Sequence, residues 1–342
     1  MISYTRRHYF LKAGLLAAII GGPNGKATPT EKYSRQMTKE DIDRWMTELS
    51  NWGRWGHDDQ AGTINLITPG KRRQAAAEIR DGFSLSLARD ADVAAQDVVA
   101  TLSAQRPYTW QHTMTRNVGG RKDGFVIDNY NISFHNTHTT HLDAFSHGFH
   151  RGVIYNGFSN DTITNWGATK DDVMPFKNGF LTRGVLVDIP ALRAVSYLGD
   201  DEAVYPEDLE AWEMKAGIKI ESGDAVFIRT GRWRRIAEKG SIGDQPTPGL
   251  YASCAKWLKQ RDIALLGSDA TQDVQPSRVD GVAQPIHLLL LVAMGTPLID
   301  CCDLEDLSEA AIQRNRWTFL FTAAPLRVPG GTGSPLNPVA TF

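Results

Sequence analysis

Residues 135–147 read His-Asn-Thr-His-Thr-Thr-His-Leu-Asp-Ala-Phe-Ser-His and contain four of the nine histidines of this 342-residue chain. His135, His141, Asp143 and His147 share odd numbering, so on an extended strand their side chains would project from one face. Such a row of imidazole and carboxylate groups is unfavourable to bury unless a cation binds it. The stretch therefore predicts a divalent metal site, and zinc and manganese both accept these ligands.

The spacing along the chain separates the candidate ligands. On a regular strand His141 and Asp143 would lie about 6.6 Å apart, at a rise of ~3.3 Å per residue, and can bind one ion together. His135 is too far along an extended strand, and it can join them only if a bulge or turn at residues 136–139 shortens the path. The same distortion could bring His138 inward, so the residues alone leave the third ligand open.

A metal ion at this row would lower the pKa of a bound water toward ~7 and polarise a carbonyl oxygen. His147 lies beyond the ligand pair on the same face, where it can move protons between water and a leaving group. The alternative is a polar strand whose histidines are hydrogen-bonded to the backbone. We favour the metal site because three histidines and one aspartate are in register.

The composition is that of a globular protein, with 42% hydrophobic and 22% charged residues. A formal net charge of −2 provides no long-range attraction to nucleic acid or to an anionic membrane. The three cysteines, Cys254, Cys301 and Cys302, cannot form a disulfide framework and are interpreted as reduced packing residues. The expected partner is a small-molecule substrate, without nucleic acid binding or stable membrane insertion.

Residues 1–27 are predicted to be an export signal. Arg6 and Arg7 precede an apolar run at residues 13–20 that is too short to span a bilayer. The paired arginines followed by Phe-Leu-Lys at residues 10–12 resemble a twin-arginine signal. This interpretation predicts a periplasmic protein, and the alternative, a frayed amphipathic start, predicts a cytoplasmic one.

Helices alternate with short apolar strands along the chain, which predicts an α/β domain with a mixed sheet. Residues 28–90 are expected to form an N-terminal helical region and loop, and residues 91–342 the catalytic domain; the alternative is one domain over 28–342. Helices are expected at residues 40–49, 69–80, 206–216, 253–261 and 287–294. Strands are expected at residues 84–87, 184–188, 225–229, 263–267 and 298–299, and on both sides of the histidines within 125–147. Residues 90–124 lack clear periodicity and are expected to be loop and strand, and the tail after Leu326 is expected to be irregular.

Residues 140–147, Thr-His-Leu-Asp-Ala-Phe-Ser-His, resemble the signature of the metal-dependent cyclase family, which includes bacterial kynurenine formamidase and isatin hydrolase. The common pattern of that family is H-x-G-T-H-x-D-x-P-x-H, in which two histidines and the aspartate bind zinc or manganese and the last histidine is catalytic. The resemblance implies that His141 and Asp143 are ligands and that His147 is the catalytic residue. The first ligand position of the pattern falls on Thr137 here.

A branch of the family has H-G-x-x-x-T-H-L-D-A instead, and His135-Asn136 is similar to its first two residues. The resemblance therefore favours His135 over His138 as the third ligand.

Similarity to that branch extends over most of residues 50–310. His287 and Asp300 are similar to a later histidine and acidic residue that contribute to a second metal in kynurenine formamidase. Because Asp300 is shorter than glutamate and its spacing differs, a one-metal site with His287 contacting substrate is the alternative. Asp269 and Asp273 flank the end of an expected strand, where α/β sites usually lie, and Asp269 is a further candidate.

The resemblance implies the swivelling β/β/α cyclase fold, with assembly into homo-oligomers. It also implies a metal-dependent hydrolase that opens a cyclic amide or lactone, or cleaves a small amide or ester, by metal-activated water, with His147 relaying the proton. One alternative is a lyase or isomerase that uses the ion to stabilise an enolate. The other is a periplasmic ligand-binding protein without turnover.

Overall fold

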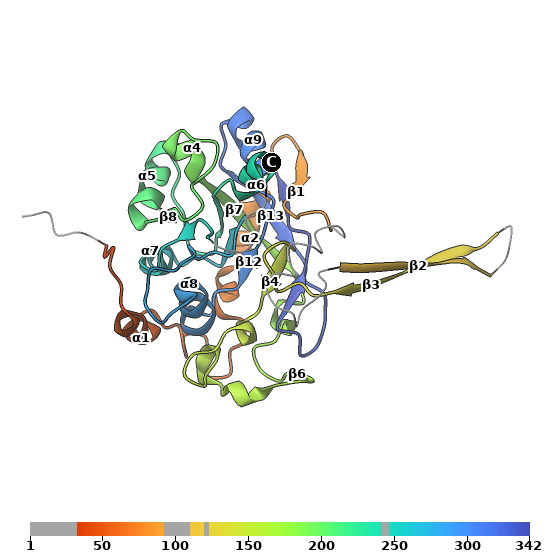
Figure 1. Cartoon of the computed structure of the whole chain (residues 1–342), viewed down its shortest axis with the longest axis horizontal. Helices are drawn as coiled ribbons and strands as arrows, with labels where there is room; N and C mark the ends of the chain where they lie inside the picture. The colour runs from red at the N-terminus through yellow and green to blue at the C-terminus, as the bar shows by residue number, and fades with distance from the viewer. Residues whose placement is uncertain (1–32, 92–109, 120–122, 241–245) are drawn as a thin grey trace, which may run out of the picture. The chain divides into compact units, whose positions relative to one another are not determined.

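A nine-stranded mixed sheet organises the chain (Figure 1), in the order β1-β15-β13-β7-β9-β11-β12-β4-β14. The computed structural model describes residues 33–91, 110–119, 123–240 and 246–342, and Tyr33–Phe342 form one unit. The predicted export signal at residues 1–27 lies outside the described residues. The strands of the sheet are β1 (Ser84–Ser86), β4 (His141–Asp143), β7 (Phe180–Asp188), β9 (Ala225–Arg229), β11 (Leu265–Ser268), β12 (Leu298–Asp300), β13 (Thr318–Ala323), β14 (Gly333–Pro335) and β15 (Val339–Thr341).

The four middle strands β7, β9, β11 and β12 run parallel, and β4 joins β12 in the antiparallel sense. Strands β9, β11, β12 and β4 are buried along their whole length. Strands that are covered on both faces have continuous apolar sequences, which is why β9 and β11 could be recognised without alternation. The predicted strand at residues 225–229 is confirmed residue for residue.

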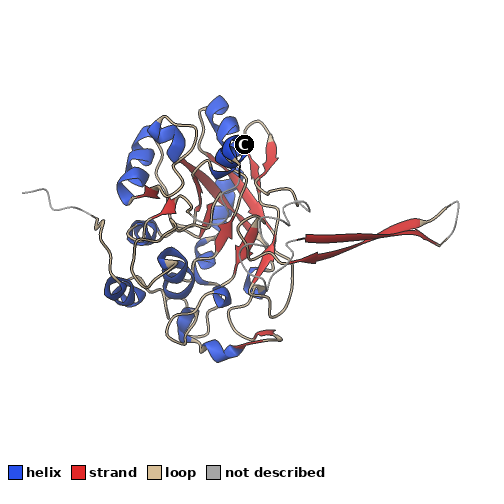
Figure 2. Cartoon of the chain, viewed as in Figure 1, coloured by secondary structure: helices blue, strands red, loops and turns tan. Residues whose placement is uncertain are grey.

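Helices pack around this sheet, as Figure 2 shows in blue around the red strands. Local signals define several of them: Thr38 and Asp41 form a capping box at the start of the first helix, and Gly217, at φ 63°, ends another. The predicted helix at residues 206–216 is confirmed. The helices are α1 (Lys39–Glu48), α2 (Pro69–Ala76), α4 (Ile189–Arg193), α5 (Pro206–Ala216), α6 (Arg232–Lys239), α7 (Cys254–Arg261), α8 (Pro285–His287), the π-helix η6 (Leu288–Met294) and α9 (Glu305–Arg314).

Shorter elements complete the unit. The 3-10 turns are η1 (Gly62–Leu66), η2 (Phe145–His147), η3 (Tyr155–Gly157), η4 (Asn160–Thr162) and η5 (Met174–Phe176). Two small strand pairs are β5 (Ile163–Thr164) with β6 (Gly167–Ala168) and β8 (Ala203–Val204) with β10 (Gly249–Leu250). Among the described residues, no helix has the length and apolar composition needed to cross a bilayer.

The tail after Leu326 is not irregular, and this expectation was wrong. It contains β14, which pairs with β4, and β15, which pairs with β13 and β1. Both strands have three residues, and Pro335 lies in an edge strand, where a missing N–H is tolerated. Their pairing partners are distant in sequence, so local composition could not indicate them.

Strands β2 (Trp110–Val118) and β3 (Phe125–Ile132) form a separate antiparallel pair. In Figure 1 this pair, called the β2–β3 arm below, projects from the nine-stranded sheet at the right of the view. The chain leaves β3 and enters the histidine-rich loop directly. The arm therefore begins beside the candidate site.

Candidate metal centre

Strand β4 carries His141 and Asp143 between β12 and β14. Asp300 of β12 pairs directly with His141, and side chains of directly opposite residues in an antiparallel pair are neighbours on one face. One ligand atom from each of His141, Asp143 and Asp300 can be chosen so that all three lie within 4.8 Å of one another. Strand register therefore adds Asp300 to the pair that the local period of two predicts.

The loop between β3 and β4 brings His135 to the same carboxylate. His135 Nε2 lies 3.3 Å from Asp143 Oδ1. The loop is folded by Asn136, whose Oδ1 accepts hydrogen bonds from the backbone N–H groups of His138, at 2.7 Å, and Thr139, at 2.8 Å. A side-chain turn of this kind shortens the path along the chain. His135 needs this shortening to lie beside Asp143.

The side chain of His138 lies near Trp233 rather than near Asp143. Its ring lies 6.3 Å from the ring of Trp233, between centroids, and His138 belongs to neither group of candidate ligands. Of the two residues that the sequence left open, the structure thus places His135 at Asp143.

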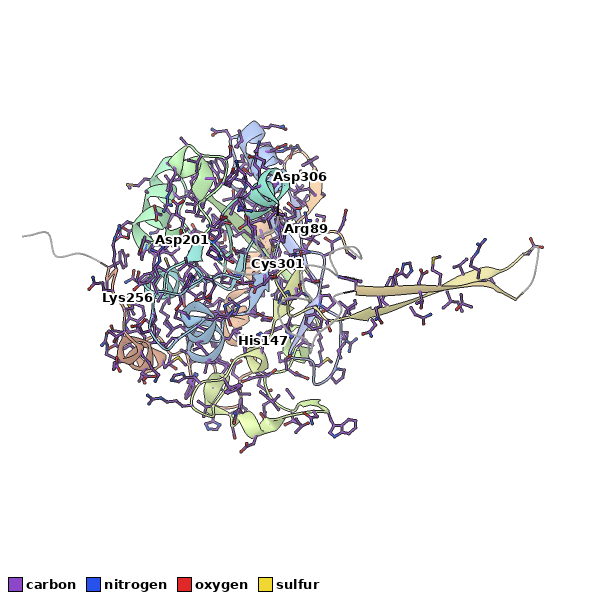
Figure 3. The ribbon with its side chains drawn as sticks, in the orientation of Figure 1. Arg89, His147, Asp201, Lys256, Cys301 and Asp306 are labelled. Atoms are coloured by element: carbon purple, nitrogen blue, oxygen red, sulfur yellow. The ribbon has the colours of Figure 1, made fainter. Side chains whose placement is uncertain are left out.

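His147, which is labelled in Figure 3, lies in η2 rather than on a continued strand. The chain turns after Asp143, and the His147 ring stacks on that of His135, with centroids 4.0 Å apart and planes at 24°. His135, Asp143 and His147 form a second group with ligand atoms within 4.8 Å of one another. The expectation that His147 lies beyond His141 and Asp143 on the same strand face was wrong, because β4 ends at Asp143, although the turn brings His147 to that carboxylate.

Asp143 is the residue that both groups share. It is 1% exposed, and neither of its carboxylate oxygens has a hydrogen-bond partner among the described residues. Burial by itself would raise the pKa of Asp143, but the neighbouring His147, His141 and His135 hold it well below its usual value. A buried carboxylate that stays ionised and accepts no hydrogen bond needs positive charge beside it.

His141 is oriented by its own loop. Its Nδ1 lies 2.7 Å from the carbonyl oxygen of Thr139, and its Nε2 lies 3.5 Å from Asp143 Oδ1. If Nδ1 donates to that carbonyl, Nε2 keeps its lone pair directed at the centre. A backbone carbonyl that fixes the tautomer in this way is typical of metal-binding histidines.

His287 reaches the centre from α8. Its Nε2 lies 3.4 Å from Asp300 Oδ2 and 3.8 Å from Asp143 Oδ2. Its Nδ1 lies 2.6 Å from Asp273 Oδ2. Burial would lower the pKa of His287, but Asp300 and Asp273 raise it well above its usual value.

Sequence reasoning assigned no role to Asp273 or to Gln272, whose Nε2 donates to Asp300 Oδ1 at 2.9 Å. Asp273 also accepts a hydrogen bond from the backbone N–H of Ile286, at 2.7 Å, and so fixes the start of α8. The only signal for these two residues was their position after β11, at the carboxyl end of a parallel strand.

Asp269 lies outside both ligand groups. Its carboxylate accepts hydrogen bonds from the backbone N–H groups of Thr230, at 2.9 Å, Gly231, at 2.8 Å, and Arg232, at 3.3 Å. Thr230 Oγ1 also donates to it, at 2.8 Å. Asp269 therefore holds the N-terminus of α6, and its oxygens are already used.

A pocket of about 510 Å³ adjoins the centre, within the size range of small-molecule sites. Thr139 and Thr140, which precede His141, form part of its wall, and the root of the β2–β3 arm forms another part. The lining also includes Arg89, Trp110, Tyr130, Ile132, Leu326 and Pro335.

The donor set suits a divalent ion. Imidazole nitrogens and carboxylate oxygens meet at the buried, unpartnered Asp143, and both zinc and manganese accept this combination.

Comparison with known proteins identifies the family of the chain. The sequence family described as "Putative cyclase" matches residues 84–272, more than half of the chain. A crystal structure described as that of a novel cyclase is 31% identical, covers 86% of this chain and 100% of its own, and superposes with a TM-score of 0.76. The chain belongs to this cyclase family. The predicted family is thereby confirmed, as is the predicted α/β fold with a mixed sheet.

Two further solved structures share the fold of this cyclase-family protein. Isatin hydrolase A from Ralstonia solanacearum is 21% identical, with 78% of this chain and 93% of that chain covered and a TM-score of 0.54. Isatin hydrolase A from Labrenzia aggregata, bound to benzyl benzoate, is 22% identical, with 78% and 94% covered and a TM-score of 0.54. No protein among those with curated descriptions matches the chain significantly.

Proposed function

We propose that this cyclase-family protein is a metal-dependent hydrolase that opens a cyclic amide or lactone, or cleaves a small amide or ester. The observation that carries the proposal is the buried Asp143 carboxylate, which accepts no hydrogen bond among the described residues and faces imidazoles from three directions. A zinc or manganese ion bound there supplies an activated water and polarises the substrate carbonyl. The shared fold with isatin hydrolases agrees with this chemistry.

His135, His141 and Asp143 are the proposed ligands of the first ion. His141 is held by the Thr139 carbonyl and His135 by the Asn136 turn, so both rings are oriented before any ion arrives. Preorganised ligands lose little conformational freedom on binding. His287 and Asp300, 3.4 Å apart, either complete a second ion site or contact the substrate.

His147 is the proposed proton carrier. It is the exposed member of the group, so its imidazole can exchange protons with solvent, and it stacks on a ligand ring at 4.0 Å. An imidazole titrates near neutral pH and can act as base and then as acid in one cycle. We assign it the transfer of a proton from the attacking water to the leaving nitrogen or oxygen.

The pocket beside the centre is proposed to bind the rest of the substrate. Trp110, Tyr130 and Ile132 offer aromatic and aliphatic surface, while Thr139 and Thr140 lie next to the ligand strand. Arg89 contributes a cation whose guanidinium lies 4.4 Å from the ring centroid of Trp233. This lining suits a small, partly apolar molecule with a polar group directed at the metal.

The proposal is tested by metal analysis and a substrate screen. The purified protein is assayed for bound transition metals, stripped with a chelator, and reconstituted separately with zinc and manganese. Each form is then incubated with lactones, cyclic amides and small linear amides and esters. We expect a product whose mass exceeds that of a cyclic substrate by one water, formed only by a reconstituted enzyme.

Three outcomes contradict the proposal. Absence of any bound or restorable divalent metal excludes the metal-dependent mechanism. A product of unchanged mass indicates an isomerase acting through an enolate. Tight metal-dependent ligand binding that survives His147→Ala, with no turnover by the unmodified enzyme, indicates a binding protein.

Export is proposed for residues 1–27 on the paired arginines and the short apolar run that follows them. Fractionation of cells expressing the full chain should recover the protein in the periplasm, and Arg6→Lys/Arg7→Lys should retain it in the cytoplasm. Recovery of both forms in the cytoplasm contradicts the assignment.

A further inference from the structure

Arg232 is a buried cation beside the histidine-rich loop. It is 5% exposed, and no carboxylate of the described residues forms an ion pair with its guanidinium. Arg229, which precedes it by three residues, is also buried but pairs with Asp188 at 3.0 Å and with Glu305 at 2.6 Å. Burying a charge without a counter-ion is unfavourable unless its donors are used. The contacts of the Arg232 guanidinium therefore indicate what it does.

The guanidinium of Arg232 holds the backbone of that loop. Its Nη1 donates to the carbonyl oxygen of Thr137 at 2.8 Å. The same Nη1 lies 3.9 Å from Sγ of Cys301, and that thiol donates to the carbonyl oxygen of Asn136 at 3.7 Å. Two consecutive carbonyl groups of the loop are thus tied to the body of the protein. The bond from Arg232 is the stronger of the two, because its donor is charged and a thiol is a weak donor.

Asp269 determines where Arg232 lies. Strands β9 and β11 are parallel neighbours, so Asp269, which follows β11, lies beside the residues that follow β9. Its carboxylate accepts hydrogen bonds from the N–H groups of Thr230, Gly231 and Arg232, and α6 begins at Arg232. Gly231 has a φ of 79°, and a Cβ there would lie 2.7 Å from Cβ of Tyr197. The carboxylate and the glycine together fix the backbone from which the Arg232 side chain reaches the loop.

We propose that Arg232 is a positioning residue of the metal centre. Anchored through Asp269, its guanidinium holds the Thr137 carbonyl and thereby keeps His135 beside Asp143 before an ion binds. Because His135 is itself a proposed ligand, this role rests on the proposed function, which it deepens.

His135 needs an external support because it reaches Asp143 from a loop and not from a strand. The side chain of Asn136 shapes that loop through hydrogen bonds within residues 133–139. Such bonds set the form of a turn but do not attach it to the sheet. The contact from Arg232 joins the loop to α6, which is tied to β11, and only β12 lies between β11 and β4 in the sheet. It therefore fixes the loop relative to the strand that carries Asp143.

The same contact affects His147. Its ring stacks on that of His135, with centroids 4.0 Å apart, so a loop that moves takes this support away. Groups that orient a metal ligand typically contribute about 10- to 100-fold to metal affinity or activity. We expect Arg232→Met, which has no donor, to lower the affinity for zinc and manganese by that factor. Any turnover at saturating metal should show a lower kcat with little change in KM.

Charge alone would have the opposite effect. A guanidinium repels a divalent cation, so if Arg232 acted only through its charge, Arg232→Met would raise metal affinity and Arg232→Lys would leave it unchanged. Lysine keeps the charge and a point-like donor but loses the planar fork of arginine. Positioning therefore predicts that affinity falls from the unmodified protein to Arg232→Lys and falls further to Arg232→Met.

The first measurement is hydrogen exchange of the metal-free full chain, followed by mass spectrometry. The N–H groups of His138 and Thr139 are bonded to Asn136 Oδ1 while the loop is folded. Arg232→Met should speed exchange in peptides covering residues 136–139 by about 10- to 100-fold, the equilibrium equivalent of one hydrogen bond to a charged group. Arg232→Lys should have an intermediate effect. Exchange in β7 and β9 should stay unchanged, which a general loss of stability would not allow.

The second measurement is calorimetric titration of zinc and manganese into the same metal-free proteins. Arg235→Met is the matched control for both measurements. Arg235 also lies on α6, three residues beyond Arg232, but it pairs with Asp200 at 2.6 Å instead of contacting the loop. This control should leave the exchange of residues 136–139 and the metal affinity unchanged.

Equal loop exchange in Arg232→Met and the unmodified protein overturns the proposal, and so does a metal affinity that is equal or higher in the variant. If Arg232→Met does not fold, Arg232→Lys decides by the same two measurements. If the unmodified protein binds no divalent metal, the proposed hydrolase function fails. Loop exchange in the metal-free chain then still decides whether Arg232 holds the loop.

Discussion

Two buried aspartates show how surroundings decide what a carboxyl group can do. Asp143 and Asp171 are 1% and 0% exposed, and neither accepts a hydrogen bond at its carboxylate oxygens among the described residues. Histidines hold the pKa of Asp143 well below its usual value against the effect of burial. Burial, reinforced by nearby Asp59, raises the pKa of Asp171 to about 8. The first carboxyl is therefore ionised and suited to the metal-ligand role proposed for it, whereas the second is kept protonated at neutral pH.

The backbone explains why the two groups differ. Asp143 lies on β4, where register places it among side chains from β12 and from the folded loop. Asp171 has a φ of 56° and makes hydrogen bonds through its backbone instead. Its N–H donates to Gln60 Oε1 at 2.8 Å, and its carbonyl oxygen accepts a hydrogen bond from the N–H of Ser146 at 3.0 Å. Asp171 thus supports the turn that carries His147, and its carboxyl group is left without a partner.

The largest effect is expected for Asp143→Asn. Removing the charge shared by both ligand groups should lower divalent-metal affinity by about 100-fold or more, because even indirect supports of metal ligands contribute 10- to 100-fold. Isothermal titration with zinc and manganese measures this change. Asp171→Asn is the matched control and should bind metal as the unmodified protein does. Equal losses in the two variants would contradict the distinction between the two acids.

His147→Ala should reduce turnover by about 10²- to 10⁴-fold, the usual contribution of a positioned acid–base group. Metal content should be unchanged, since the proposed ligands remain. Steady-state kinetics beside metal analysis of the same preparation separates the two roles. A parallel loss of metal would show that His147 is a ligand, as its place in a group with His135 and Asp143 allows.

Asp171→Asn should stabilise the protein at alkaline pH. The folded-state pKa of about 8 exceeds the ordinary value of 3.8, so the folded state binds the proton more tightly. Its contribution to stability is complete below pH ~4, declines as pH rises toward 8 and is absent above it. We expect the variant to gain up to about 6 kcal/mol of unfolding free energy at pH 8.5, because each of the roughly 4 pKa units corresponds to about 1.4 kcal/mol, and less at pH 5.

Urea unfolding at the two pH values measures that gain. Asp306→Asn provides the control, because Asp306 is an exposed acid in the first turn of α9 (Figure 3). A gain that is equal at both pH values would mean that Asp171 is not protonated in the folded protein.

The two aspartates also mark how far sequence reasoning could reach. The period of two identified His141 with Asp143, and the need for a turn at residues 136–139 was correctly predicted. Asp300 could be placed at His141 only through the pairing of β12 with β4, which local sequence does not encode. Asp171 could not be found at all, because its burial follows from the packing of distant loops.

The β2–β3 arm was predicted only in part: a strand was expected before the histidines within residues 125–147, where β3 lies, but no bounds could be given for a strand within residues 90–124, where β2 lies. Alternation of apolar and polar residues appears when one face of a strand is buried. In this arm the β3 residues are exposed through Asn131 on both faces, so no period of two is imposed on the sequence.

The smallest effect is expected for Asp273→Asn, which tests whether His287, a neighbour of Asp143, belongs to the metal centre. Asp273 lies 2.6 Å from His287 Nδ1 and fixes the ring with Nε2 toward Asp300 and Asp143. Losing this support should lower metal affinity or turnover about 10-fold, at the lower end for groups that orient a metal ligand.

If His287 and Asp300 hold a second ion, the metal stoichiometry of the variant falls from two to one at limiting metal. If His287 contacts substrate at a one-metal site, stoichiometry stays constant and KM rises with little change in kcat. A variant unchanged in both quantities would remove His287 from the site, and Asp143 would then act with His135 and His141 alone.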